Sequence, residues 1–346
     1  MDKTSPHIWV LLGTRAGDNA QALELARQLG GRTERKQLNF NRLSGLPNLV
    51  IGSGFKTLKR GHDLVPPWPD IVIATGRRAA PVSLAIKDAS GGQTMSVHIG
   101  RPRMLLERFD LVLSTPQYNL PEASNVVPLL FPFAQAKAVP MEVKERFEQT
   151  WSHLPKPWIV GVIGAGKFPV RFGEAELDGF AVELNGLAKR WAGSVILMDS
   201  PRSEAGAIQR VAKRMNVPHW LWTRSAGDNP YQAALALADC FVVTSDSVSM
   251  VSEMVQTGQP VHAYLLPVFG AVPRWSTRRG IASVLARKGI LSPPRDIGAF
   301  LSALEGKGWI GDLARGLAPS QAYCASAEHA DAVARIIALW RLRAMD

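Results

Sequence analysis

Short apolar runs alternate with amphipathic stretches along most of this chain, and the alternation predicts its secondary structure. Runs such as IWVLL at 8–12 and WIVGVI at 158–163 have the length and composition of buried strands. Apolar residues at helical spacing occupy the stretches between them. This order favours open parallel sheets covered by helices on both faces, an α/β fold. Strands are predicted at 7–12, 70–74, 94–98, 111–114, 158–163, 194–198, 219–222, 240–243 and 261–265, and helices at 18–29, 80–87, 103–108, 174–191, 203–215, 230–238 and 247–257.

This alternation of apolar and amphipathic stretches is interrupted once, at 125–140, where NVVPLLFPFAQAKAVP contains three prolines. We interpret this stretch as a linker or an exposed apolar loop. The alternation then starts afresh, which predicts two doubly wound, Rossmann-like domains facing a cleft, at 1–150 and 151–326. A last helical pattern at 327–346 is expected to pack back on the first domain.

Composition narrows the class of protein. The chain is 46% hydrophobic and 20% charged, as in a globular protein, and it lacks an apolar run long enough to span a bilayer. Its start has too short an apolar run for a secretion signal. Cys240 and Cys324 are the only cysteines and form no CxxC pair, which indicates a reducing compartment without a structural zinc site. We therefore expect a cytoplasmic protein that needs no metal.

The formal net charge of +11 indicates a polyanionic partner: nucleic acid, anionic lipid or a phosphorylated substrate. The basic residues are spread along the chain without an RRM, zinc-finger or helix-turn-helix signature. This pattern favours a membrane surface or a phosphate-rich acceptor over nucleic acid. Together with the apolar LLFPF at 129–133, it predicts a peripheral membrane protein that acts on a lipid-linked acceptor.

Ligands of open parallel sheets bind beyond the carboxyl ends of the strands, so the strand-to-helix turns are the first place to search for chemistry. GVIGAGK at 161–167 has the spacing of a phosphate-binding P-loop, but Phe168 stands where the magnesium-binding hydroxyl belongs. Gly164 and Lys167 remain candidates for contact with an anionic ligand, and a plain turn with a surface lysine is an equal alternative.

A second turn follows the predicted strand at 194–198 and carries Ser200, Arg202 and Ser203. Two hydroxyls and a guanidinium at the start of a helix suit a diphosphate. The alternative is an ordinary serine cap beside a solvated arginine.

The richest turn is TSDSVSMVSE at 244–253, where Ser245, Asp246, Ser247 and Ser249 exceed what helix capping needs. Glu253 lies too far along the helix for a capping box, whose place is held by Met250. It shares a helix face with Asp246, so its carboxylate could accept the hydroxyls of a ribose whose diphosphate lies at the helix end. The alternative is an exposed helix glutamate.

This constellation resembles the donor half of GT-B glycosyltransferases, in which a serine- and glycine-rich turn and a helix glutamate hold a nucleotide-sugar. More closely, TSDSVSMVSEMVQTGQPV is similar to the mitochondrial-fission ELM-type family, whose activity is assigned by fold similarity. GDNAQALELARQLG, TGRRAAPVSLAIK and RFDLVLSTPQYNLP extend the resemblance over residues 8–340. Two positions depart from the pattern: Met250 replaces a frequent threonine, and Gly100-Arg101-Pro102-Arg103 stands where Asp-Pro-Arg is common.

The resemblance implies a transferase with a nucleotide-sugar substrate, no cofactor, and a lipid-linked or cell-envelope glycan as acceptor. A non-catalytic adaptor of the same fold and a sugar-nucleotide 2-epimerase are the alternatives. In this fold the general base comes from the N-terminal domain, where Asp18 is the best-placed carboxylate and His98 the second candidate. A helix cap for Asp18 and a core position for His98 are the competing interpretations.

Overall fold

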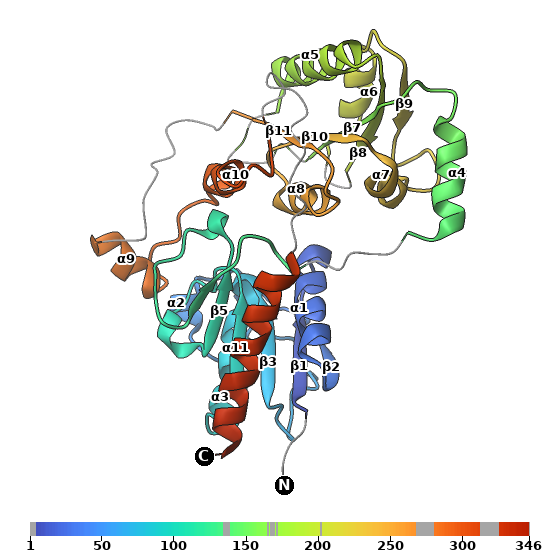
Figure 1. Cartoon of the computed structure of the whole chain (residues 1–346). Helices are drawn as coiled ribbons and strands as arrows, with labels where there is room; N and C mark the ends of the chain where they lie inside the picture. Colours follow the sequence, from blue (N-terminus) through green and yellow to red (C-terminus); the bar gives the residue numbers. More distant parts are fainter. Residues whose placement is uncertain are drawn as a thin grey trace. The chain divides into compact units, whose positions relative to one another are not determined.

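The computed structural model describes residues 5–133, 139–164, 166, 170, 172–200, 203–267, 280–311 and 325–345. These residues form two compact units, each built on one parallel sheet with helices on both faces (Figure 1). In its described part, the first unit comprises 5–133, 280–296 and 325–345, and the second takes the remainder. The prediction of two doubly wound α/β sheets is therefore confirmed.

The first sheet has the strand order β2-β1-β3-β4-β5-β6, and every adjacent pair is parallel. Side chains alternate between its faces, as strand geometry requires. Ile8 and Val10 belong to the core cluster with α1 and α11, whereas Trp9 and Leu11 belong to the cluster on the α3 side. The elements of this unit are β1 (His7–Leu12), α1 (Ala16–Leu29), β2 (Arg32–Gln37), η1 (Arg42–Gly45), α2 (Asn48–Ile51), β3 (Ile71–Thr75), α3 (Gly76–Ala89), β4 (Met95–Ile99), η2 (Leu106–Arg108), β5 (Leu111–Ser114), η3 (Pro116–Tyr118), β6 (Val126–Pro128), α9 (Gly280–Arg287) and α11 (Ala325–Met345).

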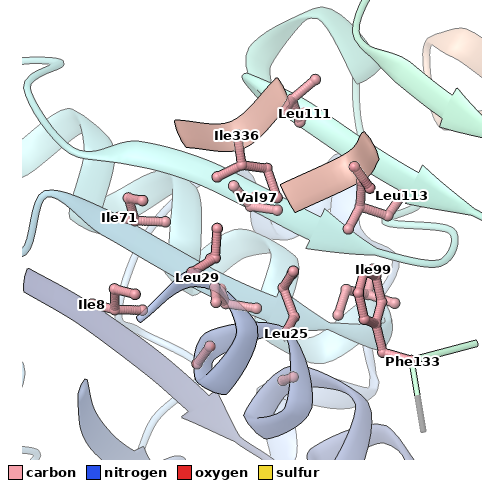
Figure 2. Packing of buried hydrophobic residues seen from close by; sticks show 14 of the residues in the cluster. Ile8, Leu25, Leu29, Ile71, Val97, Ile99, Leu111, Leu113, Phe133 and Ile336 are labelled. Atoms are coloured by element: carbon pink, nitrogen blue, oxygen red, sulfur yellow. The ribbon is translucent and has the colours of Figure 1, made fainter. Parts of the chain in front are cut away.

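Helix α11 completes the core of the first unit. Figure 2 shows Ile336 of α11 among side chains of the strands and of α1. Ala332 and Trp340 of the same helix are also buried in this cluster. The last helix of the chain therefore buries apolar surface on a sheet whose strands were made some 200 residues earlier.

The second sheet has the order β11-β10-β7-β8-β9, again with parallel neighbours. Helices α5 and α6 share a core cluster with β7 and β8. No helix among the residues described in either unit is long and apolar enough to span a membrane. The elements are α4 (Met141–Trp151), β7 (Trp158–Ile163), α5 (Glu174–Arg190), β8 (Ser194–Asp199), α6 (Ala207–Ala212), β9 (His219–Trp222), α7 (Tyr231–Leu237), β10 (Cys240–Thr244), α8 (Val248–Val255), β11 (Val261–Tyr264) and α10 (Ile297–Glu305).

The stretch at 125–140 was predicted as a linker or an exposed apolar loop, and for its described apolar residues up to 133 the exposed-loop alternative is wrong. Residues 126–128 form β6 at the edge of the first sheet, and Leu129, Phe131 and Phe133 are at most 3% exposed. Phe133 stacks on His329 of α11 with ring centroids 4.1 Å apart. These apolar side chains belong to the core, so they are not available to a membrane.

The compact units divide the chain differently from the predicted boundaries at 150 and 326. Helix α4 belongs to the second unit, and residues 280–296 belong to the first. Asp296 donates its amide hydrogen to the carbonyl of Gln117, and Arg101 donates to the carbonyl of Pro293. Hydrogen bonds within the first unit thus hold a segment that lies far along the sequence.

Candidate donor site in the second unit

The candidate residues of the second unit gather at the carboxyl edge of its sheet. Strands β7, β8 and β10 are neighbours and run parallel, so the turns that follow Ile163, Asp199 and Thr244 lie at one edge. This edge is where open parallel sheets bind ligands.

Two side chains hold the turn after β7 in place: those of Thr244, the last residue of β10, and of Asp246, two residues later. The Gly164 amide donates to Thr244 Oγ1 at 2.7 Å, and the Thr244 hydroxyl donates to Asp246 Oδ1 at 2.7 Å. Asp246 Oδ2 accepts the amide hydrogen of Gly166 at 3.1 Å. A Cβ atom on residue 164 would lie 2.2 Å from Asp246 Oδ1, so only glycine fits there. Asp246 therefore stabilises the glycine turn.

Hydrogen bonds of Ser200 and Ser203 connect the chain after β8 to the end of β7. The Ser203 hydroxyl donates to the carbonyl of Ile163 at 2.9 Å and accepts the Ser200 amide hydrogen at 2.8 Å. The two hydroxyl oxygens are 2.9 Å apart, and both residues are buried. The Ser203 hydroxyl thus bonds to the backbone at the end of β7 and directly after β8. Neither serine lies at a helix start as predicted, because α6 begins at Ala207 with Gly206 as its N-cap. Lys167 and Arg202, the cations predicted for these turns, lie outside the described residues.

The three serines before α8 and in its first turn have different surroundings. Ser245 Oγ accepts the Leu266 amide hydrogen at 3.0 Å and so holds the chain after β11. Ser247 is buried at the N-cap position of α8, whereas Ser249 in the first turn is exposed. Ser249 and the first amides of α8 are the donors that an anion approaching this helix end would meet.

Glu253 is bonded to a tyrosine that the sequence did not single out. Its Oε2 accepts the hydroxyl hydrogen of Tyr231, the first residue of α7, at 2.7 Å. Burial, and then the negative charge of Glu253, raise the pKa of Tyr231 well above its usual 10. The tyrosine therefore stays protonated and donates. A carboxylate has about four acceptor positions in all, and Tyr231 takes one of those of Glu253.

Arg224 supplies a cation at the same edge, directly after β9. Its Nε lies 3.3 Å from Asp199 Oδ2, and its guanidinium also donates to the carbonyl of Ser203 at 3.0 Å. The Asp199 side chain is 7% exposed, and its Oδ1 has no hydrogen-bond partner among the residues with described positions. Arg224 itself is 41% exposed, so part of the guanidinium faces solvent. In the sequence, Arg224 could have been found as the arginine that closely follows a predicted strand, in TRSAGDN.

The two base candidates of the first unit lie in contrasting surroundings. Asp18 lies in the first turn of α1, half-buried, with Oδ2 4.0 Å from a guanidinium nitrogen of Arg15. Arg15 holds the N-cap position, and Asn19 bonds the backbone of Gly13, so Asp18 is not the helix cap. A carboxylate in the first turn interacts favourably with the helix dipole.

His98 is fully buried in β4, with its ring 5.3 Å from that of Phe109. Neither ring nitrogen has a hydrogen-bond partner among the described residues. Burial lowers the pKa of His98 to about 3, so the imidazole is neutral. This position matches the core interpretation of His98 better than that of a base in contact with substrate.

Across the described part of both units, no three His, Cys, Asp or Glu side chains come close enough together to hold a metal ion.

Comparison with solved structures shows the fold. A glycosyltransferase from Rickettsia africae ESF-5 has a TM-score of 0.51 at 11% identity, covering 98% of this chain and 99% of that one. The UDP-GlcNAc 2-epimerase from Neisseria meningitidis, bound to UDP-GlcNAc, has a TM-score of 0.50 at 11% identity, covering 96% and 99%. The two parallel sheets with flanking helices are those of the GT-B glycosyltransferase fold.

Comparison of sequences shows the family. Mitochondrial fission protein ELM1 of Arabidopsis thaliana is 30% identical over 224 residues, which are 56% of this chain and about half, 51%, of that protein. Uncharacterized protein RP120 of Rickettsia prowazekii (strain Madrid E) is 23% identical over 303 residues, covering 77% of this chain and 85% of that protein. The pattern of the family described as Mitochondrial fission ELM1 matches residues 16–335, and this chain therefore belongs to that family.

Proposed function

We propose that this protein is a glycosyltransferase that moves a sugar from a nucleotide-sugar to a lipid-linked or cell-envelope glycan acceptor. The observation that supports it most is the Glu253 carboxylate, oriented by Tyr231 in a helix that starts at the carboxyl edge of the second sheet. Two of the solved proteins of this fold are a glycosyltransferase and an enzyme bound to UDP-GlcNAc.

In the proposed donor complex, Glu253 accepts hydrogen bonds from the ribose hydroxyls while Tyr231 holds its carboxylate in place. The diphosphate lies at the start of α8, where amides, the helix dipole and Ser249 favour negative charge. Arg224 stabilises the charge that develops on the leaving diphosphate, in the role predicted for Arg202 and Lys167. These groups would neutralise the leaving group without a metal or another cofactor. Gly164 leaves room for the Asp246 carboxylate, and Thr244 and Asp246 keep that turn in shape.

In the transfer step, the acceptor hydroxyl oxygen forms the new bond to the anomeric carbon as the bond to the diphosphate oxygen breaks. Asp18 takes the hydroxyl proton. We prefer it to His98 because Asp18 is half-buried in a strand-to-helix turn, whereas His98 has no exposed surface. We place the reaction in the cytoplasm, on the inner face of a membrane that supplies the lipid-linked acceptor; nucleic acid is not a partner.

A thermal-shift panel with UDP-, GDP- and CMP-sugars tests donor binding. A ligand at about 100 times its Kd stabilises a protein by about 2.7 kcal/mol, which is readily measured. Glu253→Ala should abolish the shift, while Glu305→Ala, an exposed glutamate of α10, should preserve it. If no nucleotide-sugar shifts the wild type, glycosyl transfer is excluded.

A non-catalytic adaptor is the second candidate, because the Arabidopsis relative is named as a mitochondrial fission protein. It predicts no shift with any nucleotide-sugar. A 2-epimerase, as one solved structure of this fold is named, predicts a shift together with a changed sugar in the absence of any acceptor. Product analysis with and without acceptor separates this last possibility from transfer.

A further inference from the structure

Residues 42–51 of the first unit have an inverted pattern of burial. They form η1 and α2, in which Ser44 and Asn48 are 5% and 3% exposed. Four of the five large apolar side chains of this segment point outward, while the fifth, Ile51, is 4% exposed. The exposed fractions of the four are 46% for Leu43, 44% for Leu46, 56% for Leu49 and 67% for Val50.

Hydrogen bonds beneath the segment fix this orientation. Asn48 Nδ2 donates to the carbonyls of Arg77 and Pro102, at 2.8 and 2.9 Å. The Arg77 guanidinium donates to the carbonyls of Ser44 and Leu46, at 2.7 and 2.5 Å. The buried polar groups are thus anchored to α3 and to the chain after β4. The exposed apolar side chains are therefore held outward by the fold.

A cationic depression of about 470 Å³ adjoins this apolar surface. Arg42, Lys59 and Arg78 line it together with Phe40 and Asn41. None of the three cations forms an ion pair with a described residue, and residues 35–62 contain no Asp or Glu. Burial, and then the positive charges of Arg103 and Arg78, lower the pKa of Arg77 below its usual value. This side of the first unit therefore carries a net positive charge, which an anion bound from outside the protein would neutralise.

We propose that this surface docks the protein on an anionic lipid bilayer. The apolar side chains enter the boundary between headgroups and acyl chains, and the three cations bind lipid phosphates. The members of the docking surface are Leu43, Leu46, Leu49, Val50, Arg42, Lys59 and Arg78. A second copy of the chain fits this surface poorly, because two identical faces would bring the cations of both copies together.

The proposal deepens the membrane part of the proposed function and gives it a surface other than the buried residues 129–133. It does not involve the donor site, so the two can fail separately. Docking here would keep the first unit, which holds Asp18, next to a lipid-linked acceptor.

Flotation with vesicles tests the proposal. The full chain is mixed with vesicles of phosphatidylcholine alone, or of equal parts phosphatidylcholine and phosphatidylglycerol. The wild type should float only with the anionic vesicles. Binding should weaken as salt rises from about 0.1 to about 1 M, which shortens the Debye length from about 10 to about 3 Å. The apolar variant Leu49→Ser/Val50→Ser and the charge variant Arg42→Gln/Lys59→Gln/Arg78→Gln should each lower the vesicle partition coefficient about tenfold or more.

Matched controls come from exposed positions of the second unit. Val182→Ser, at a side chain 68% exposed, controls for the apolar variant, and Lys189→Gln/Lys213→Gln/Lys307→Gln controls for the charge variant. Both controls should bind vesicles like the wild type. All variants should keep the wild-type unfolding midpoint in urea and the wild-type shift with nucleotide-sugar, so that lost docking is distinguished from lost folding or donor binding.

Three results would overturn the proposal: no flotation of the wild type, flotation that neither docking variant weakens, or equal loss in the controls. Sedimentation velocity adds a fourth. If the wild type self-associates, does not bind vesicles, and dissociates on Leu49→Ser/Val50→Ser, the surface is a subunit interface.

Discussion

At the scale of single residues, the structure of the candidate donor site depends on a glycine, Gly164, as much as on the carboxylates of Asp246 and Glu253. Gly164 lets the Asp246 carboxylate pass close to the backbone, and the same carboxylate then holds Gly166. These contacts therefore hold the turn after β7 against the turn after β10, although about 80 residues separate the two in sequence.

Gly164→Ala should break this arrangement. The added Cβ would force Asp246 away from the Gly166 amide and the Thr244 hydroxyl, which we expect to cost about 1–3 kcal/mol of unfolding free energy. The control is Gly186→Ala in α5, where a Cβ meets no atom within 4 Å and should stabilise by up to about 1 kcal/mol. Urea denaturation measures both; equal effects of the two variants would show that the turn tolerates a side chain.

His98 makes folding depend on pH. Unfolded His98 titrates near 6.5, whereas burial keeps the folded imidazole neutral down to a pKa of about 3. Protons therefore favour the unfolded chain, and stability falls as pH drops from 6.5 toward 3. Between pH 7 and pH 5 the loss is about 2 kcal/mol.

His98→Leu should remove this part of the pH dependence and leave the remaining dependence as in the wild type. The measurement is the urea unfolding free energy at pH 7 and pH 5 for both proteins. An equal loss in wild type and variant would mean that His98 gains a proton in the folded state.

At the scale of elements, α7 and α8 are joined by the bond between Tyr231 and Glu253. Tyr231→Phe leaves a partly buried carboxylate with one donor fewer, and should destabilise the protein by about 1.5–3 kcal/mol. A double-mutant cycle with Glu253→Ala should give a coupling energy of at least about 1 kcal/mol, because each single change removes the same bond. Additive effects in urea denaturation would show that the two side chains act independently.

The strands of both sheets could be predicted because buried parallel strands are nearly continuous apolar runs. β2 was missed because RTERKQ is an exposed edge strand with no such run. Residues 129–133 were misjudged, since an apolar run between prolines does not tell whether a later helix covers it. The cluster of polar residues around Glu253 was visible in the sequence. Its bond to Tyr231 was not, because it depends on how two helices that begin on different turns face each other.

At the scale of the whole molecule, the first unit is discontinuous in sequence. Residues 280–296 and α11 return to it after nearly all of the second unit has been made. Ile336 of α11 is fully buried between α1 and the sheet, whereas Leu342 of the same helix is 62% exposed.

Ile336→Ala should therefore destabilise the first unit by about 2–5 kcal/mol. Leu342→Ala should change the stability by no more than about 0.5 kcal/mol. Hydrogen exchange can assign the effect: amides of β1, β3 and β4 should exchange faster in Ile336→Ala, while those of β7 and β10 keep their protection. Loss of protection in both sheets would instead show that the two units unfold together.

The late position of α11 also sets an order for folding on the ribosome. The first six strands emerge early, but the part of one sheet face that α11 covers, beside α1, stays open until residues 325–345 have been synthesised. By then the second unit has been synthesised and can complete its core first, which reverses the usual order of domain folding during synthesis. Throughout that interval the nascent chain exposes the apolar surface that α11 later covers, and this is the stage at which we expect it to need a chaperone most.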